Sequence, residues 1–314
     1  IRIVTLVRLV TERAAISSRG GVGLKRIVVF SLLAGFIVWS GTVAAEDGLK
    51  VFISIDMEGV TGVANWEDVS RDGKDYDLFR KLMTLEANAA VEGAAAAGAS
   101  EIWVRDSHGS ARNLLPDVLD RRAILVRDWS GGPKGMMEGL DESFDAAIFL
   151  GYHAKAGTPD SLLEHTSSGS VTDFSVNGIS MPEGGYNALI AGSYGVPVVF
   201  VAGGKTLCEQ MTGLLGEVET VPVKHGIGAA AVSLHPEVTR EQIRDGVAAA
   251  LRRLGDFTPY RLEAPYTLVV KLKSEETVNK GSHYPGATRT GDWELSYTSD
   301  EFIEVMKAFS YVRR

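Results

Sequence analysis

Two acidic side chains directly follow an apolar stretch near the start of the chain. The run from Leu49 to Ile55 reads as a buried strand and leads into Asp56-Met57-Glu58-Gly59. Because side chains of a strand alternate between its two faces, Asp56 and Glu58 point the same way where the strand ends. In open α/β sheets ligands bind at this edge, and two buried like charges there need a cation or a donor. The alternative is a solvated turn with incidental acids.

Two histidines follow the ends of two further apolar strands. His108 comes after the strand predicted at 101–106, and His153 after the one at 146–150. Asp, Glu and neutral His suit zinc and related divalent metals, and two-metal hydrolases use a bridging carboxylate to activate water. Taken singly, each histidine is more often a hydrogen-bonded surface or core residue. Asp106 either orients His108 or caps the turn.

Apolar strands alternate with helical patterns along most of the chain. This alternation predicts an α/β fold with a mostly parallel sheet and helices on both faces, a three-layer arrangement. After about residue 230 an amphipathic helix, further strands and a final helix predict a smaller C-terminal α/β subdomain. The predicted organisation is an over-extended N-terminus at 1–24, a signal peptide at 25–45, a metal-binding catalytic α/β domain at 46–230 and the subdomain at 231–314.

The N-terminal stretch has the pattern of a secretory signal peptide. Basic residues at 25–26 precede an apolar run at 27–39, and small residues at 43–45 end it. The run is too short for a comfortable membrane span, although an uncleaved anchor is the alternative. Residues 1–24 fit nothing expected upstream of such a signal. We therefore expect a periplasmic or secreted protein that meets a membrane only through its signal peptide.

The charge balance excludes several partners. The 314 residues include 32 Lys and Arg against 40 Asp and Glu, a net charge of −8. Residues 1–45 hold six of the basic and one of the acidic residues, so the remainder has 26 against 39, a net charge of −13. Such a chain is unsuited to nucleic acid or anionic lipid surfaces. The single cysteine, Cys208, rules out an internal disulfide framework and is expected to be a small packed residue.

Five motifs, in order, resemble those of the zinc-dependent D-aminopeptidase family, typified by the enzyme of the bacterial dipeptide-transport operon. The resemblance runs from about Leu49 to the C-terminus. The chain departs from the family at Gly203-Gly204-Lys205, where the family has Gly followed by acidic residues, and in the Leu-Glu before His165. The motifs are SIDMEG at 54–59, RDSHGS at 105–110, MMEGLD at 136–141, FLGYHAKAGTP at 149–159 and GGYNA at 184–188.

The resemblance implies two Zn²⁺ ions per subunit and a set of ligands. Asp56 matches the aspartate that bridges the two metals. Glu58 and His153 match the other protein ligands of one zinc, and His108 and Glu183 match those of the second. These five residues are the predicted metal ligands.

His165 matches the family histidine assigned as catalytic nucleophile or acid/base group. The pattern alone favours a different interpretation, a loop histidine in solvent. It also does not distinguish Glu183 from Glu164, since Glu183 has the character of an acidic first turn of a helix.

The resemblance further implies an aminopeptidase for short peptides with an N-terminal D-amino acid of the D-Ala type. The simplest nucleophile is a water activated by the metals, with His165 as general acid or base. Family members form ring-like homodecamers, so a homo-oligomer is expected. Two alternatives share the ligand set: a metallohydrolase of L-peptides or cell-wall fragments, and an exported binding protein without turnover.

Overall fold

The computed structural model describes residues 48–314. The predicted over-extended N-terminus and signal peptide, residues 1–45, therefore lie outside the described residues. Within the described part, the chain forms one compact unit built on two β-sheets. None of the helices in this part combines the length and the apolar character that crossing a membrane requires.

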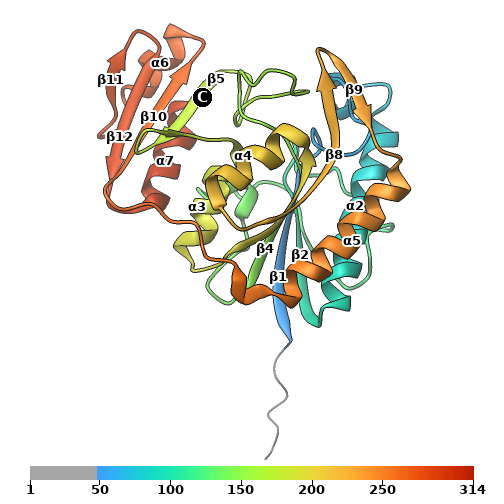
Figure 1. The fold of residues 1–314 in the computed structure, drawn as a ribbon. Coiled ribbons are helices and arrows are strands. Elements are labelled where there is room, and N and C mark those ends of the chain that lie inside the picture. Colours follow the sequence, from blue (N-terminus) through green and yellow to red (C-terminus); the bar gives the residue numbers. More distant parts are fainter. Residues whose placement is uncertain (1–47) are drawn as a thin grey trace, which may run out of the picture. The chain divides into compact units, whose positions relative to one another are not determined.

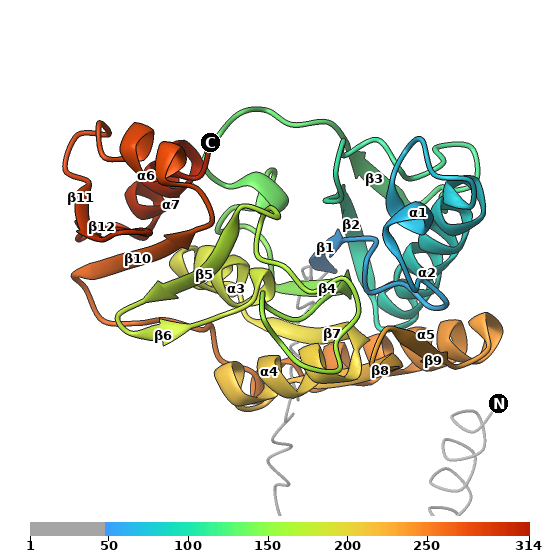
Figure 2. The ribbon, with the colours of Figure 1, turned by 90° about the horizontal axis from the view of Figure 1, so that it is seen from above.

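The large sheet has seven strands in the spatial order β3-β2-β1-β4-β7-β8-β9 (Figure 1, with all seven labelled in Figure 2). All neighbouring pairs are parallel except β8 with β9, so the prediction of a mostly parallel sheet is confirmed. The strands are β1 Leu49–Ile55, β2 Ala99–Asp106, β3 Ala123–Val126, β4 Ala146–Tyr152, β7 Val198–Gly204, β8 Glu219–Ile227 and β9 Ala230–Ser233.

Helices cover both faces of the large sheet, as predicted. On one face α2 and α5 lie side by side, and α3 and α4 cover the other (Figures 1 and 2). The alternation along β1 serves both cores, because Ile53 packs toward α2 and α5 whereas Phe52 packs toward α3. The helices are α1 Trp66–Val69, α2 Tyr76–Ala96, α3 Glu183–Ser193, α4 Lys205–Leu215 and α5 Pro236–Arg252, with short 3-10 turns η1 Gly135–Met137 and η2 Leu254–Asp256.

The small sheet has five antiparallel strands in the order β11-β12-β10-β5-β6. It combines the β5–β6 hairpin from the middle of the chain with strands near its end, while α5, which follows residue 230, packs on the large sheet. The hairpin turns at Asn177-Gly178, whose φ angles of 51° and 79° suit a tight primed turn. These elements are β5 Val171–Val176, β6 Ile179–Ser180, β10 Tyr266–Leu272, α6 Glu275–Gly281, β11 Thr288–Gly291, β12 Glu294–Ser299 and α7 Phe302–Val312.

Candidate metal centre

The ends of β1 and β4 come together because two glycines allow their loops to touch. The Asp56 N–H donates to the Leu150 carbonyl at 2.8 Å, and the Gly59 N–H donates to the Gly151 carbonyl at 2.7 Å. A Cβ on Gly59 would lie 1.9 Å from the Tyr152 carbonyl oxygen, and one on Gly151 would lie 2.1 Å from that of Asp56. Gly151 also has a φ of +63°, which disfavours other residues. The SIDMEG and FLGYH motifs therefore meet edge to edge.

His153 turns one ring nitrogen toward two buried carboxylates. Its Nε2 lies 3.5 Å from Asp56 Oδ2 and 3.6 Å from Glu183 Oε1. Its Nδ1 lies 3.0 Å from the Ala154 carbonyl oxygen, to which a neutral imidazole donates its proton. Nε2 then carries a lone pair, and it is buried without a hydrogen-bond partner among the described residues. A bound cation would satisfy this atom.

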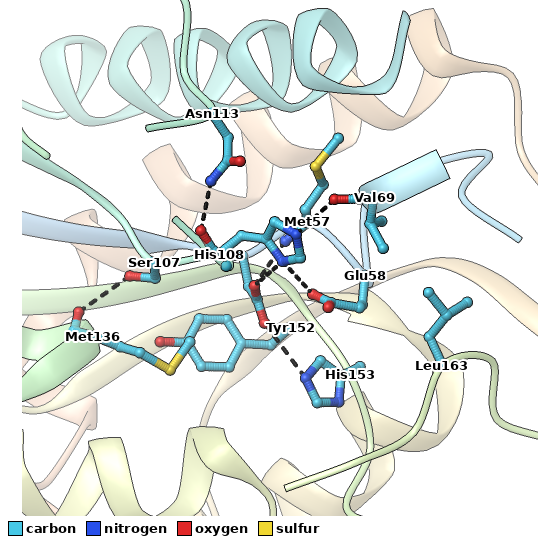
Figure 3. Close-up of polar contacts among 12 residues, drawn as sticks. Met57, Glu58, Val69, Ser107, His108, Asn113, Met136, Tyr152, His153 and Leu163 are labelled. Atoms are coloured by element: carbon cyan, nitrogen blue, oxygen red, sulfur yellow. Dashed lines mark hydrogen bonds and ion pairs between the residues drawn. The ribbon is translucent and has the colours of Figure 1, made fainter. Parts of the chain in front are cut away.

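His108 has the same arrangement with its two nitrogens exchanged. Its Nε2 lies 2.9 Å from the Val69 carbonyl oxygen, and its Nδ1 lies 2.9 Å from Glu58 Oε2 and 3.3 Å from Asp56 Oδ1. Figure 3 shows the His108 ring directed at Glu58 and held from behind by Val69. The backbone carbonyl fixes the tautomer, which leaves Nδ1 to face the carboxylates.

Asp106 caps the turn that carries His108. Its carboxylate accepts hydrogen bonds from the backbone N–H groups of Asn113 and Leu114, at 2.6 and 2.7 Å. The side chain of Asn113 in turn donates to the His108 carbonyl at 2.6 Å. Of the two roles predicted for Asp106, the structure therefore shows the cap. It supports His108 through the backbone, because no contact joins the Asp106 carboxylate to the imidazole among the described residues.

Glu183 links His165 to the cluster around His153. It is the first residue of α3, and its Oε1 accepts a hydrogen bond from the Ser167 N–H at 2.5 Å. The same oxygen lies 3.6 Å from His165 Nε2, and the His165 side chain is only 16% exposed. Its Nδ1 lies 2.9 Å from the Leu163 carbonyl oxygen. The interpretation of His165 as a solvated loop residue is therefore wrong.

The loop around His165 is conformationally strained. Three of its residues that are not glycine have positive φ angles: 50° at Asp160, 54° at Leu163 and 66° at Ser167. A branched residue such as Leu163 rarely adopts this region, and such strain is concentrated at functional sites. The Leu-Glu before His165, noted above as a departure from the family, thus includes a position, Leu163, that glycine would occupy with less strain.

The cluster carries an excess of buried negative charge. Burial, together with repulsion from Glu58, raises the pKa of Asp56 well above its ordinary value. Burial also acts to raise the pKa of Glu58, but the attraction of His108 outweighs it, and that pKa is lowered well below its ordinary value. Burial opposes the charged form of His108, yet Glu58 and Asp56 raise its pKa well above the ordinary value. These groups need positive charge among them.

The donor set fits divalent metals. Three ligand atoms gather within 4.8 Å of one another in each of two groups, Asp56 with Glu58 and His153, and His153 with His165 and Glu183. Two ligands bound to zinc at tetrahedral angles are about 3.3–3.6 Å apart, close to the separations between His153 Nε2 and its two carboxylates. The first group is the set that the resemblance implied for one zinc.

A pocket of about 740 Å³ lies over this cluster. Asp56, Glu58, His108, His165 and Glu183 all contribute to its lining. Its volume falls in the range of small-molecule sites, about 300–1,000 Å³. The predicted site residues are therefore brought together at a cavity that can take a short peptide.

Sequence reasoning missed the side chains that hold the site from behind. Lys224 of β8 is buried, and its Nζ donates to the carbonyls of Glu58 and Val63 at 2.5 and 2.6 Å. Burial lowers its pKa to about 7. The Tyr152 hydroxyl shares a hydrogen bond with Ser54, at 2.7 Å. The only available signals were a lysine within an apolar strand and a serine two residues before Asp56.

Comparison with known proteins places the chain in a family. A family model described as D-aminopeptidase matches residues 49–311. The chain is 32% identical over 264 residues to the D-aminopeptidase of Bacillus subtilis (strain 168), covering 83% of this chain and 95% of the relative. It superposes with a TM-score of 0.81 and 30% identity on the Zn-dependent D-aminopeptidase DppA from Bacillus subtilis, described as a self-compartmentalizing protease, over 84% of this chain and 96% of that one. This chain belongs to the D-aminopeptidase family.

Proposed function

We propose that the protein is an exported aminopeptidase with two zinc ions, which releases an N-terminal D-amino acid of the D-Ala type from short peptides. The observation that carries the proposal is the buried cluster of Asp56, Glu58 and Glu183 with three histidines, each of which directs one ring nitrogen at a carboxylate and the other at a backbone carbonyl. A Zn-dependent relative supports the choice of metal.

Asp56 lies between two of the other predicted ligands. Asp56 has one carboxylate oxygen near His108 and the other near His153, which suits the bridging role. These residues would hold zinc, which when bound would supply a Lewis acid for the scissile carbonyl. His165 is left for proton transfer: its Nε2 has a lone pair, and its ring lines the pocket. It would accept a proton from the attacking water and return it to the departing amine.

Location and assembly belong to the same proposal. The signal-peptide pattern at residues 25–45 supports export, and D-alanine peptides are released outside the cytoplasmic membrane by cell-wall turnover. DppA is described as self-compartmentalizing, which supports a homo-oligomer, as in the decameric rings of the family.

Metal content and activity measured on one sample test the proposal. Residues 46–314 would be purified, their zinc counted per chain, and D-Ala-D-Ala assayed beside L-Ala-L-Ala with and without a chelator. We expect two zinc ions and cleavage of the D-peptide alone, lost with the chelator and restored by zinc. Cleavage of the L-peptide instead would refute the proposed stereospecificity while retaining the site. A metal-free protein without turnover would be a binding protein and would refute the enzyme.

A further inference from the structure

The pocket over the metal cluster has an uneven charge. Apart from the three carboxylates of the cluster, each charged residue of its described lining is a cation, or a histidine that can become one. The lysine and arginines are Arg71, Lys134, Arg313 and Arg314. Zinc would compensate the three carboxylates, so the remainder of the pocket would present positive charge to a substrate.

Arg313 differs from the other three cations. Lys134 already has a hydrogen-bond partner, because its Nζ donates to the Leu140 carbonyl at 2.9 Å. Arg71 and Arg314 are exposed to solvent. Arg313 is partly buried, and its Nε is a buried donor without a hydrogen-bond partner among the described residues. Its guanidinium forms no ion pair within residues 48–314. A buried, unpaired donor is costly unless a ligand satisfies it.

Packing ties Arg313 to the wall of the pocket that carries Glu183. Its guanidinium carbon lies 5.5 Å from the centre of the Phe309 ring, one turn earlier near the end of α7. Phe309 packs on Tyr186 with ring centres 5.9 Å apart, and Tyr186 is one turn after Glu183 on α3. All four residues line the same pocket.

A hydrogen bond to its backbone also holds Arg313 in place. The carbonyl of Arg313 accepts a hydrogen bond from Ser170 at 3.4 Å, in the strained loop whose Ser167 donates to Glu183. Residues 129–134, in the stretch between β3 and η1, also line the pocket, and in Figure 2 this stretch arches toward the C-terminus. Arg313 is thus a packed cation in the lining of the same cavity that holds the metal ligands.

We propose that Arg313 binds the free carboxylate of the substrate, so that the enzyme selects short peptides ending in a carboxylate next to the scissile bond. A guanidinium pairs with a carboxylate through two parallel hydrogen bonds. The proposal rests on the proposed function for the position of the scissile bond. Arg313 lies just beyond residues 49–311, the range of the family match.

Two substrates that differ only in the carboxylate test the proposal. The zinc-loaded protein would be assayed on D-Ala-D-Ala and on the same dipeptide with its C-terminus amidated, comparing the original chain with Arg313→Gln and Arg313→Lys. We expect Arg313→Gln to raise KM for D-Ala-D-Ala about ten- to a hundredfold, with kcat little changed. KM for the amide should change less than about twofold, and Arg313→Lys should recover part of the loss.

A matched control separates this effect from net charge and from folding. Arg252→Gln makes the same substitution at an exposed position on α5, across the large sheet, and should leave both KM values unchanged. Zinc content and the thermal midpoint should be equal in all variants. Equal losses on the acid and the amide in Arg313→Gln would overturn the proposal, as would equal KM values for the two substrates in the original chain.

The proposed function can fail separately. If the D-peptides are not cleaved, the same comparison with L-Ala-L-Ala and its amide decides the role of Arg313 while the stereospecificity is refuted. If none of the four is cleaved, calorimetric titration with the two D-dipeptides decides it. Weaker binding of the acid alone in Arg313→Gln would support the proposal, and equal binding of both would overturn it.

Discussion

The rings of His153 and His165 are stacked, with centroids 3.9 Å apart and an angle of 13° between their planes. Both Nε2 atoms lie 3.6 Å from the same oxygen of Glu183, and both Nδ1 atoms bond to backbone carbonyls. The two side chains differ in access, since that of His153 is 2% exposed and that of His165 is 16% exposed and lines the pocket. One histidine is thus placed to hold a cation and the other to reach a substrate.

Replacing His165 should separate catalysis from metal binding. We expect His165→Ala to keep its zinc and to lose about 10²–10⁴-fold in kcat, the usual contribution of a general acid or base. Zinc analysis and steady-state kinetics on the same sample would measure both. His283→Ala, at an exposed histidine in a turn, is the control and should behave like the original chain. Full activity in His165→Ala would contradict the catalytic role.

Lys224 should stabilise the loop that carries Glu58. Lys224→Met removes the donor to the carbonyls of Glu58 and Val63 and leaves two buried acceptors unpaired. We expect the free energy of unfolding to fall by about 2–6 kcal/mol, at about 1–3 kcal/mol for each of the two unsatisfied groups. Urea denaturation measures it. Lys205→Met, at an exposed lysine, should change stability by less than about 0.5 kcal/mol. Equal stabilities for the two variants would argue against this role.

The contact between the β1 and β4 loops should tolerate only glycine. Gly59→Ala places a methyl group against the Tyr152 carbonyl oxygen and must push the loops apart. We expect weaker zinc retention during dialysis and a lower thermal midpoint, because the ligands of the two loops lose their spacing. The matched control is Gly213→Ala on α4, where a Cβ meets no atom within 4 Å. That change should stabilise the helix by up to about 1 kcal/mol. Unaltered zinc retention in Gly59→Ala would refute the expectation.

Cys208 should be inert in the folded protein. Burial raises the pKa of its thiol to about 12. Only the thiolate reacts, so at pH 8 alkylation by iodoacetamide should be about a thousandfold slower than in urea, where the thiol pKa is about 8.5. Cys208→Ala supplies the blank. Labelling at the same rate with and without urea would show that the thiol is not buried.

The same shift predicts the dependence of stability on pH. The pKa is higher in the folded state than in the unfolded state, so the proton favours folding. This contribution is fully present below about pH 8.5, the unfolded value. It is lost as the pH rises toward about 12, the folded value. Urea midpoints of the original chain and of Cys208→Ala should therefore diverge from pH 9 upward, the original chain falling faster.

The strands of the large sheet and the ends that carry the site could be predicted from local pattern. The period of two along Leu49–Ile55 fixed the common direction of Asp56 and Glu58, and the apolar runs before His108 and His153 placed both histidines at one edge. The strands that carry these residues are far apart in the chain. A parallel sheet nevertheless brings the carboxyl ends of its strands to one edge, whatever loops connect them. Local sequence was therefore enough for these four residues.

Only the tertiary structure decided the remaining positions. The pattern left Glu183 and Glu164 equal, and it is packing between α3 and the strained loop that sets Glu183 against both His153 and His165. Lys224 comes from a strand 166 residues after Glu58. The small sheet joins β5 to β10, where the paired residues Ser175 and Val269 are 94 positions apart in the chain. Such contacts depend on which surfaces meet after folding, and a pattern of neighbouring residues carries no information about them.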